Sequence, residues 1–209
     1  ELMLPTALKD LIMEKRGLIL VVGATGSGKS TSIASMIDHR NELQTGHILT
    51  FEDPIEYLFR SKKSIINQRE VGTDARNLQT AMRNALRQAP DVLFIGEIRE
   101  RDNMAAALAY AMSGHLVVAT LHATNSAHAL NRVMSFYPIE SRQALFQDMA
   151  AAMRAIVSQR LVRSKKGARV PAVEILMNTG QMSALIEKGD VSSIKEAMEQ
   201  SLSPESQSF

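Results

Sequence analysis

The segment VVGATGSGKST, residues 21–31, decides the fold that this sequence predicts. Residues 23–30 match the pattern G-x-x-x-x-G-K-[ST] in full, after a β-branched apolar run and before a helical pattern. Glycines let successive backbone N–H groups point at phosphate oxygens, and the start of the following helix adds partial positive charge. The segment therefore predicts a phosphate-binding loop. Its expected nucleotide-binding residues are Gly23, Ala24, Thr25, Gly26, Ser27, Gly28, Lys29, Ser30 and Thr31.

Two side chains of this loop have expected chemical roles. Lys29 would bridge the β- and γ-phosphates of a nucleotide, and the Ser30 hydroxyl would ligate Mg²⁺. The alternative is a glycine-rich turn between a strand and a helix, with a solvated lysine. The complete motif and its correct flanks favour the phosphate loop over that alternative.

Composition bounds the possible functions. The 209 residues are 45% apolar, enough for a sizeable core, and no apolar run is long enough to span a bilayer. The absence of cysteine excludes a disulfide framework and a thiolate zinc site. Basic and acidic residues number 24 and 22, and aromatic residues are only 4%. The chain therefore has a weak overall field and few stacking platforms, so nucleic acid is not an expected partner.

Short β-branched runs alternate with helical segments along the chain, which predicts an α/β fold with a mostly parallel sheet flanked by helices. Strands are expected at 18–22, 47–51, 91–96, 116–121 and 170–176, and helices at 29–43, 74–88 and 100–113. Apolar residues at three- and four-residue spacing predict one long helix over 139–162. Residues 164–169 are expected to form a charged turn, two small helices to divide at 188–190, and the tail 201–209 to pack little. We interpret the chain as one domain, with a nucleotide-binding core over 1–162 and a strand and helical extension over 163–209.

Two of the expected strands end in acidic residues. Glu52 and Asp53 follow one strand, and Glu97 follows another after Gly96, which stands where such strands commonly carry aspartate. The carboxyl ends of parallel strands meet at one edge of a sheet, so we expect these carboxylates near the phosphate loop. One carboxylate near Mg²⁺ and another that aligns water are the minimum set for phosphoryl transfer to water. The alternative is that these acids only solvate the ends of loops.

Two histidines, His115 and His122, flank the strand expected at 116–121. Seven extended residues span roughly 23 Å at ~3.3 Å each, and an odd separation puts the two rings on opposite faces. Zinc holds its ligand nitrogens about 2 Å away, so the two histidines cannot share an ion. His122 is expected at the same edge as the loop and the acids, where its imidazole would contact the γ-phosphate or report its loss. His115 is expected at the opposite edge, as a structural hydrogen-bonding group.

Four segments, in order, resemble the motifs of the type IV pilus retraction ATPases, the PilT/PilU group of secretion ATPases. These segments are GATGSGKST, ILTFEDPIEY, QAPDVLFIGEIR and GHLVVATLHATN. The resemblance continues through FYPIESRQ, VSQRLV and VPAVEILMNT, so it covers nearly the whole chain. The sequences QAPDVLFIGEIR and LIEKGDVSSIKEAMEQS resemble the PilU branch more than the PilT branch. The family implies a RecA-like P-loop NTPase core, a hexameric ring, and hydrolysis of ATP with Mg²⁺ to power retraction of the pilus in twitching motility.

The resemblance also implies roles for individual residues. Glu52 would polarise the attacking water, and Glu97 would support the Mg²⁺ shell, directly or through water. His122 would lie near the γ-phosphate and complete the catalytic set, with His115 as the second member of its motif. Asp53 belongs to the same acidic motif as Glu52. The order Gly-Glu at 96–97 is the one that this family carries.

The resemblance implies partners and a location as well. These are further copies of the chain in a ring, the platform protein of the pilus in the inner membrane, a companion PilT ATPase, and a cytoplasmic position peripheral to the bacterial inner membrane. The segment 164–169 contains no cysteine, whereas assembly and secretion relatives commonly carry a tetracysteine insert there, which favours retraction. The family has an N-terminal PAS-like domain, which would precede this chain. Two other functions remain open: an ATP-binding accessory subunit that tunes a companion PilT motor, and a RecA-like nucleic-acid translocase.

Overall fold

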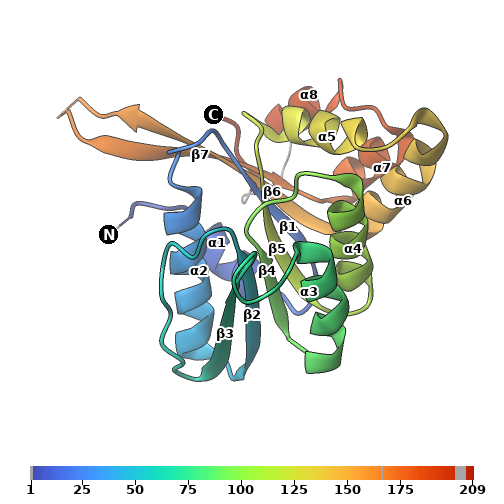
Figure 1. The fold of residues 1–209 in the computed structure, drawn as a ribbon. Helices are drawn as coiled ribbons and strands as arrows, with labels where there is room; N and C mark the ends of the chain where they lie inside the picture. Colours follow the sequence, from blue (N-terminus) through green and yellow to red (C-terminus); the bar gives the residue numbers. More distant parts are fainter. Residues whose placement is uncertain (1, 166, 201–205) are drawn as a thin grey trace.

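A seven-stranded sheet forms the centre of the fold (Figure 1), in the computed structural model that describes residues 2–165, 167–200 and 206–209. Its strand order is β3-β2-β4-β5-β1-β6-β7. The strands are β1 (Gly17–Val22), β2 (Gly46–Glu52), β3 (Ser64–Glu70), β4 (Val92–Ile95), β5 (Leu116–Leu121), β6 (Met153–Arg163) and β7 (Arg169–Met177). Every neighbouring pair is parallel except β6 and β7. The predicted α/β fold with a mostly parallel sheet is therefore confirmed.

Helices cover both faces of the sheet. They are α1 (Ala7–Met13), α2 (Lys29–Leu43), α3 (Leu78–Ala85), α4 (Arg101–Met112), α5 (Ser126–Ser135), α6 (Arg142–Ala152), α7 (Gly180–Lys188) and α8 (Ile194–Glu199), with 3₁₀ turns at Leu86–Gln88 and Ile139–Ser141. Successive side chains of a strand point to opposite faces, and β1 is buried throughout. Ile19 and Val21 pack with α1 and α2, whereas Leu18, Leu20 and Val22 pack with the helices of the other face. Burial on both faces explains why β1 is a continuous apolar run.

The prediction of one helix over 139–162 is wrong in its second half. Helix α6 ends at Ala152, and β6 begins at the next residue. This strand pairs with β1 on one side and β7 on the other. Without β6, the backbone N–H and C=O groups on one side of the buried β1 would lack partners. This tertiary requirement outweighs the helical preference of an alanine- and methionine-rich run.

The remaining predicted strands and helices are present, and the structure adds the strand β3 and the helices α1 and α5. The hairpin of β6 and β7 projects from the body of the protein (Figure 1). Of the charged turn expected at its tip, residue 166 lies outside the described residues. The division proposed between residues 162 and 163 falls near the end of β6 and stays a proposal.

Residues 207–209 of the tail are exposed, as expected, but Gln207 and Phe209 make specific contacts with the sheet. Residues 201–205 lie outside the described part of the chain. Gln207 exchanges two backbone hydrogen bonds with Ile175 of β7, with N···O distances of 2.8 and 3.0 Å. The guanidinium carbon of Arg160 lies 3.9 Å from the centre of the Phe209 ring. Among the described residues, no helix has both the length and the apolar character needed to cross a membrane.

Candidate functional site

The phosphate loop joins the carboxyl end of β1 to the first residue of α2, as the motif predicts. Lys29 begins α2, and its ammonium turns back over the loop. Its Nζ atom donates hydrogen bonds to the carbonyl oxygens of Gly23, at 2.8 Å, and Ala24, at 3.0 Å. Burial lowers the pKa of Lys29, although the carboxylates of Glu97 and Glu56 act in the opposite direction. The loop therefore surrounds a partly buried cation that lies close to two acids.

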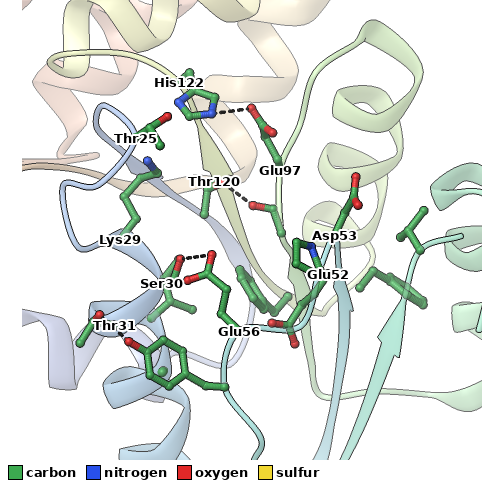
Figure 2. A pocket seen from close by; sticks show the side chains of 18 of the residues that line it. Thr25, Lys29, Ser30, Thr31, Glu52, Asp53, Glu56, Glu97, Thr120 and His122 are labelled. Carbon is green, nitrogen blue, oxygen red and sulfur yellow. Dashed lines mark hydrogen bonds and ion pairs between the residues drawn. The ribbon is translucent and has the colours of Figure 1, made fainter. Parts of the chain in front are cut away.

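A cavity of about 840 Å³ opens beside this loop. Its walls come from the loop and from the segments that follow β2, β4 and β5, and Figure 2 shows their side chains gathered around it. Lys29, Glu52, Glu97 and His122 all line the cavity, as does Asp53. The structure therefore brings together the residues that were predicted to meet at one edge of the sheet.

Glu52 is the last residue of β2, and it is 7% exposed. Its Oε1 atom accepts hydrogen bonds from the hydroxyl of Thr50, at 2.7 Å, and from the side-chain amide of Gln68, at 3.0 Å. Both donors belong to strands, so the carboxylate is held by the sheet and not by a mobile loop. Asp53 is different, because its side chain is 61% exposed and lies 3.5 Å from Nη1 of Arg99.

Glu97 lies between an imidazole and a guanidinium. Its Oε1 atom is 3.0 Å from Nε2 of His122, and its Oε2 atom accepts a 2.6 Å hydrogen bond from Nε of Arg99. That hydrogen bond, with the negative charge of Glu97, raises the pKa of Arg99. Figure 2 shows His122 and Glu97 turned toward one another above the phosphate loop. The arrangement links the end of β5 to the end of β4 through one carboxylate.

Gly96 has a steric reason for standing where aspartate is common. A β-carbon at this position would lie 3.1 Å from the carbonyl oxygen of Phe51 and 3.2 Å from the α-carbon of Glu52. The Gly96 amide also donates to that Phe51 oxygen, at 2.7 Å, and the Thr120 hydroxyl donates to the carbonyl of Gly96. A β-carbon at 96 would thus be crowded by the backbone at the end of β2, which would have to shift by a few tenths of an ångström to admit it. The acidic group follows one residue later.

Sequence reasoning did not assign two residues that contact the loop. Glu56 accepts a 2.9 Å hydrogen bond from the hydroxyl of Ser30, the predicted metal ligand, and Tyr57 shares a 2.8 Å hydrogen bond with the hydroxyl of Thr31. Both come from the segment after β2, which crosses the first turn of α2 (Figure 2). The signal available was a second acid four residues after Glu52, in the same acidic motif.

A third unassigned residue, Gln159, contacts the loop from β6. It is 3% exposed, and its side chain hydrogen-bonds to Ser27 and Ser32. Because the segment was expected to be helical, no pattern in the sequence placed Gln159 beside the loop.

His115 lies at the other end of β5, away from the cavity. Its ring meets the ring of Tyr110 edge to face, with centroids 5.4 Å apart, and its Nδ1 atom is 3.1 Å from the hydroxyl of Ser113. Within the described residues, no three His, Asp or Glu side chains are grouped as a protein-only metal site. His115 and His122 lie at opposite ends of β5, as the spacing predicts.

The residues around the loop fit a magnesium–nucleotide complex by their chemistry. Mg²⁺ prefers oxygen ligands and usually binds through one or two protein oxygens together with substrate phosphates. Ser30 supplies a hydroxyl, and Glu56 and Glu97 supply carboxylates that line the same cavity. The buried hydroxyl of Ser27 has no hydrogen-bond partner among the described residues.

Comparisons with known proteins agree with this geometry. The family model for the type II/IV secretion system protein matches residues 4–202. The type IV pilus ATPase PilU of Pseudomonas aeruginosa is 47% identical over 210 residues, which cover 100% of this chain and 55% of PilU. The type IV pilus retraction ATPase PilT of the same bacterium is 41% identical over 184 residues, which cover 88% of this chain and 54% of PilT. The greater identity to PilU agrees with the resemblance seen in the sequence.

A solved structure supports the same conclusion for the fold. The crystal structure of the pilus retraction motor PilT with bound ADP superposes with a TM-score of 0.90 at 42% identity, covering 94% of this chain and 57% of that chain. The predicted P-loop ATPase fold of the RecA-like type is therefore confirmed. The chain spans about half the length of the relatives that it matches.

Proposed function

Because the chain belongs to the type II/IV secretion system protein family, we propose that the protein hydrolyses ATP with Mg²⁺ to drive retraction of a type IV pilus. One observation carries the proposal. A complete phosphate loop, two strand-end carboxylates and an imidazole line one cavity of about 840 Å³. Binding alone would need only the loop, whereas the carboxylates supply what transfer of a phosphoryl group to water requires.

The loop side chains would bind and orient the phosphates. The Lys29 ammonium now donates to two carbonyl oxygens, and it can exchange these for phosphate oxygens of greater negative charge. Bound Mg²⁺ would neutralise charge on the β- and γ-phosphate oxygens. The Ser30 hydroxyl would hold the metal, and Glu97 would support its shell. Glu56, which is hydrogen-bonded to Ser30, is a further carboxylate at that position.

Glu52 is suited to polarise the attacking water. Two hydrogen bonds fix its Oε1 atom, whereas its Oε2 atom accepts none from the described residues. One oxygen thus orients the carboxylate, and the other is available to a water proton. His122 would contact the γ-phosphate, and its neighbour Glu97 would hold the imidazole in place. Glu52, Glu97 and His122 are the proposed catalytic residues.

The proposed work of the protein depends on assembly and partners. We propose a hexameric ring that acts on the platform protein of the pilus at the cytoplasmic face of the inner membrane, beside a companion PilT ATPase. The names of the relatives support this, since PilU and PilT are described as type IV pilus ATPases. Closure of adjacent subunits around nucleotide is the type of rigid-body change that performs such work.

Phosphate release by the full-length protein tests the chemistry. Lys29→Ala and Glu52→Gln should abolish turnover, whereas Lys9→Ala, which removes an exposed lysine of α1, should not. Retained turnover in either site variant would contradict the assigned roles. Nucleotide binding without turnover by the unaltered protein would instead support the accessory-subunit function. Cells that lack the protein should carry excess pili that do not retract, and loss of pili would indicate extension.

A further inference from the structure

Gln159 connects a distant strand to the phosphate loop. Its Nε2 atom donates a 2.8 Å hydrogen bond to the carbonyl oxygen of Ser27, and its Oε1 atom accepts a 2.7 Å hydrogen bond from the hydroxyl of Ser32. Ser27 lies inside the loop, and Ser32 lies in the first turn of α2. One buried amide therefore ties the loop to the helix that follows it.

The orientation of this amide follows from its partners. A backbone carbonyl can only accept, so the group of Gln159 that faces Ser27 must be the NH₂. The Ser32 hydroxyl, which can donate, then faces the side-chain oxygen. Turning the amide over would place its oxygen against the Ser27 carbonyl oxygen and leave that buried carbonyl without a donor, whereas the Ser32 hydroxyl could pair in either orientation. The Ser27 carbonyl thus fixes which end of the amide faces the loop, and Ser32 holds the other end.

The contact with Ser27 sets the direction of the next N–H group. A peptide unit is planar and trans, so the carbonyl of Ser27 and the N–H of Gly28 point in opposite directions. Gln159 holds the carbonyl away from the cavity, in keeping with the 6% exposure of Ser27. Gly28, in contrast, lines the cavity. The Gly28 N–H is thereby turned to the side where the phosphates would bind.

Gly28 itself is constrained by the same side chain. Its φ angle is +87°, in the left-handed region, and a β-carbon there would lie 2.8 Å from Nε2 of Gln159. The backbone angle therefore favours glycine at this position of the phosphate-loop motif, and a side chain there would also displace the Gln159 amide.

From these contacts we infer that Gln159 is a positioning residue for phosphate binding, which holds the Ser27–Gly28 peptide with its N–H toward the ligand. The inference rests on the proposed function only in taking nucleotide phosphates as the ligand of the loop. It deepens that function by adding a residue of β6 to the assigned site residues, which lie in the phosphate loop, at the start of α2 and at the ends of β2, β4 and β5.

The test uses full-length protein and two probes, ADP and inorganic pyrophosphate, in calorimetric titrations without turnover. Gln159→Met keeps the length of the side chain but removes the donor. Gln159→Glu places a carboxylate oxygen against the Ser27 carbonyl. Each variant should weaken both probes about tenfold, the effect of one lost hydrogen bond. Pyrophosphate has no base or sugar, so weaker binding of pyrophosphate would show that the variants impair binding of the phosphates.

Val157→Ala is the matched control, because Val157 is buried on the same strand and packs in the same core as α2. It should lower the melting temperature yet leave both dissociation constants within about twofold. Unchanged affinities in both Gln159 variants would overturn the inference. If neither variant folds, Gln159→Asn decides, since it keeps a buried amide but shortens the side chain by one methylene and withdraws the donor from the Ser27 carbonyl: weaker pyrophosphate binding would support the inference, and wild-type affinity would overturn it. Tight binding without ATP turnover in the unaltered protein would refute the proposed function and leave this inference standing.

Discussion

Replacing Glu97 by glutamine should separate catalysis from stability. The change removes one negative charge and keeps the side-chain shape, so it weakens the contacts to Arg99, at 2.6 Å, and His122, at 3.0 Å. The side chains of these partners are 63% and 51% exposed. Exposed ion pairs contribute about 0.2–1 kcal/mol each, so the free energy of unfolding should fall by less than about 2 kcal/mol. Loss of one fixed electrostatic group at a reacting centre costs about 100- to 1,000-fold in kcat.

Steady-state phosphate release and urea denaturation of the full-length variant measure both quantities. Glu14→Gln is the matched control, because Glu14 is a 46% exposed acid that lies 3.7 Å from Nε of Arg154 and does not line the cavity. It should lose at most about 1 kcal/mol of stability and keep its kcat. A Glu97→Gln protein with kcat within about threefold of the unaltered protein would refute the role of Glu97. A loss of stability well above 2 kcal/mol would show that Glu97 is mainly structural.

Three other predictions concern the loop and the core. Burial lowers the pKa of Lys29 in the free protein, and bound phosphates would raise that pKa again. The affinity for ADP should therefore fall, by at most about tenfold per pH unit, as the pH rises through the lowered pKa toward 10.5. Titrations of ADP over that pH range measure the effect, and Lys29→Ala should remove the pH dependence. The Phe51 side chain is 1% exposed, so Phe51→Ala should lower the free energy of unfolding by about 3–5 kcal/mol, measured by urea denaturation. A loss below about 1 kcal/mol would contradict the place of Phe51 in the core. Nη1 of the buried Arg40 donates hydrogen bonds to the carbonyls of Ile12 and Glu14, at 2.6 and 2.8 Å. Arg40→Met should therefore lower the free energy of unfolding by about 2–4 kcal/mol and speed hydrogen exchange in α1. Unchanged exchange in α1 would argue against that role.

The sequence predicts the interior strands β1 and β5 well. Helices cover both faces of these strands, so β1 is a continuous apolar run and β5 is one interrupted only by Thr120. The edge strand β3 escaped prediction because only its first residue, Ser64, is buried and its remaining pattern is largely polar. The apolar spacing over 139–162 and the helical preference of residues 149–155 predict a helix where β6 forms. The strand conformation of β6 results from its pairing with β1, a long-range contact that the local sequence does not reveal.

The sequence likewise predicts some features of the candidate site and not others. Lys29, Glu52, Glu97 and His122 could be predicted to share one edge, because each belongs to a motif or follows an apolar strand. The pairing of Glu97 with His122 depends on the order of β4 and β5 in the sheet and on side-chain angles. The contact of Glu56 with Ser30 depends on the path of the segment after β2 across α2. These features arise from three-dimensional packing and leave no spacing rule in the sequence.

The separation of Gln159 from Ser27, 132 residues along the chain, has a consequence for biosynthesis. A ribosome releases the phosphate loop well before the strand that orients its peptide, because that strand begins only at Met153. Until then one edge of β1 also lacks its neighbour and is open to pairing with other nascent chains. We therefore expect nucleotide to be captured late during translation, and a product that stops before residue 153 to be a substrate for chaperones.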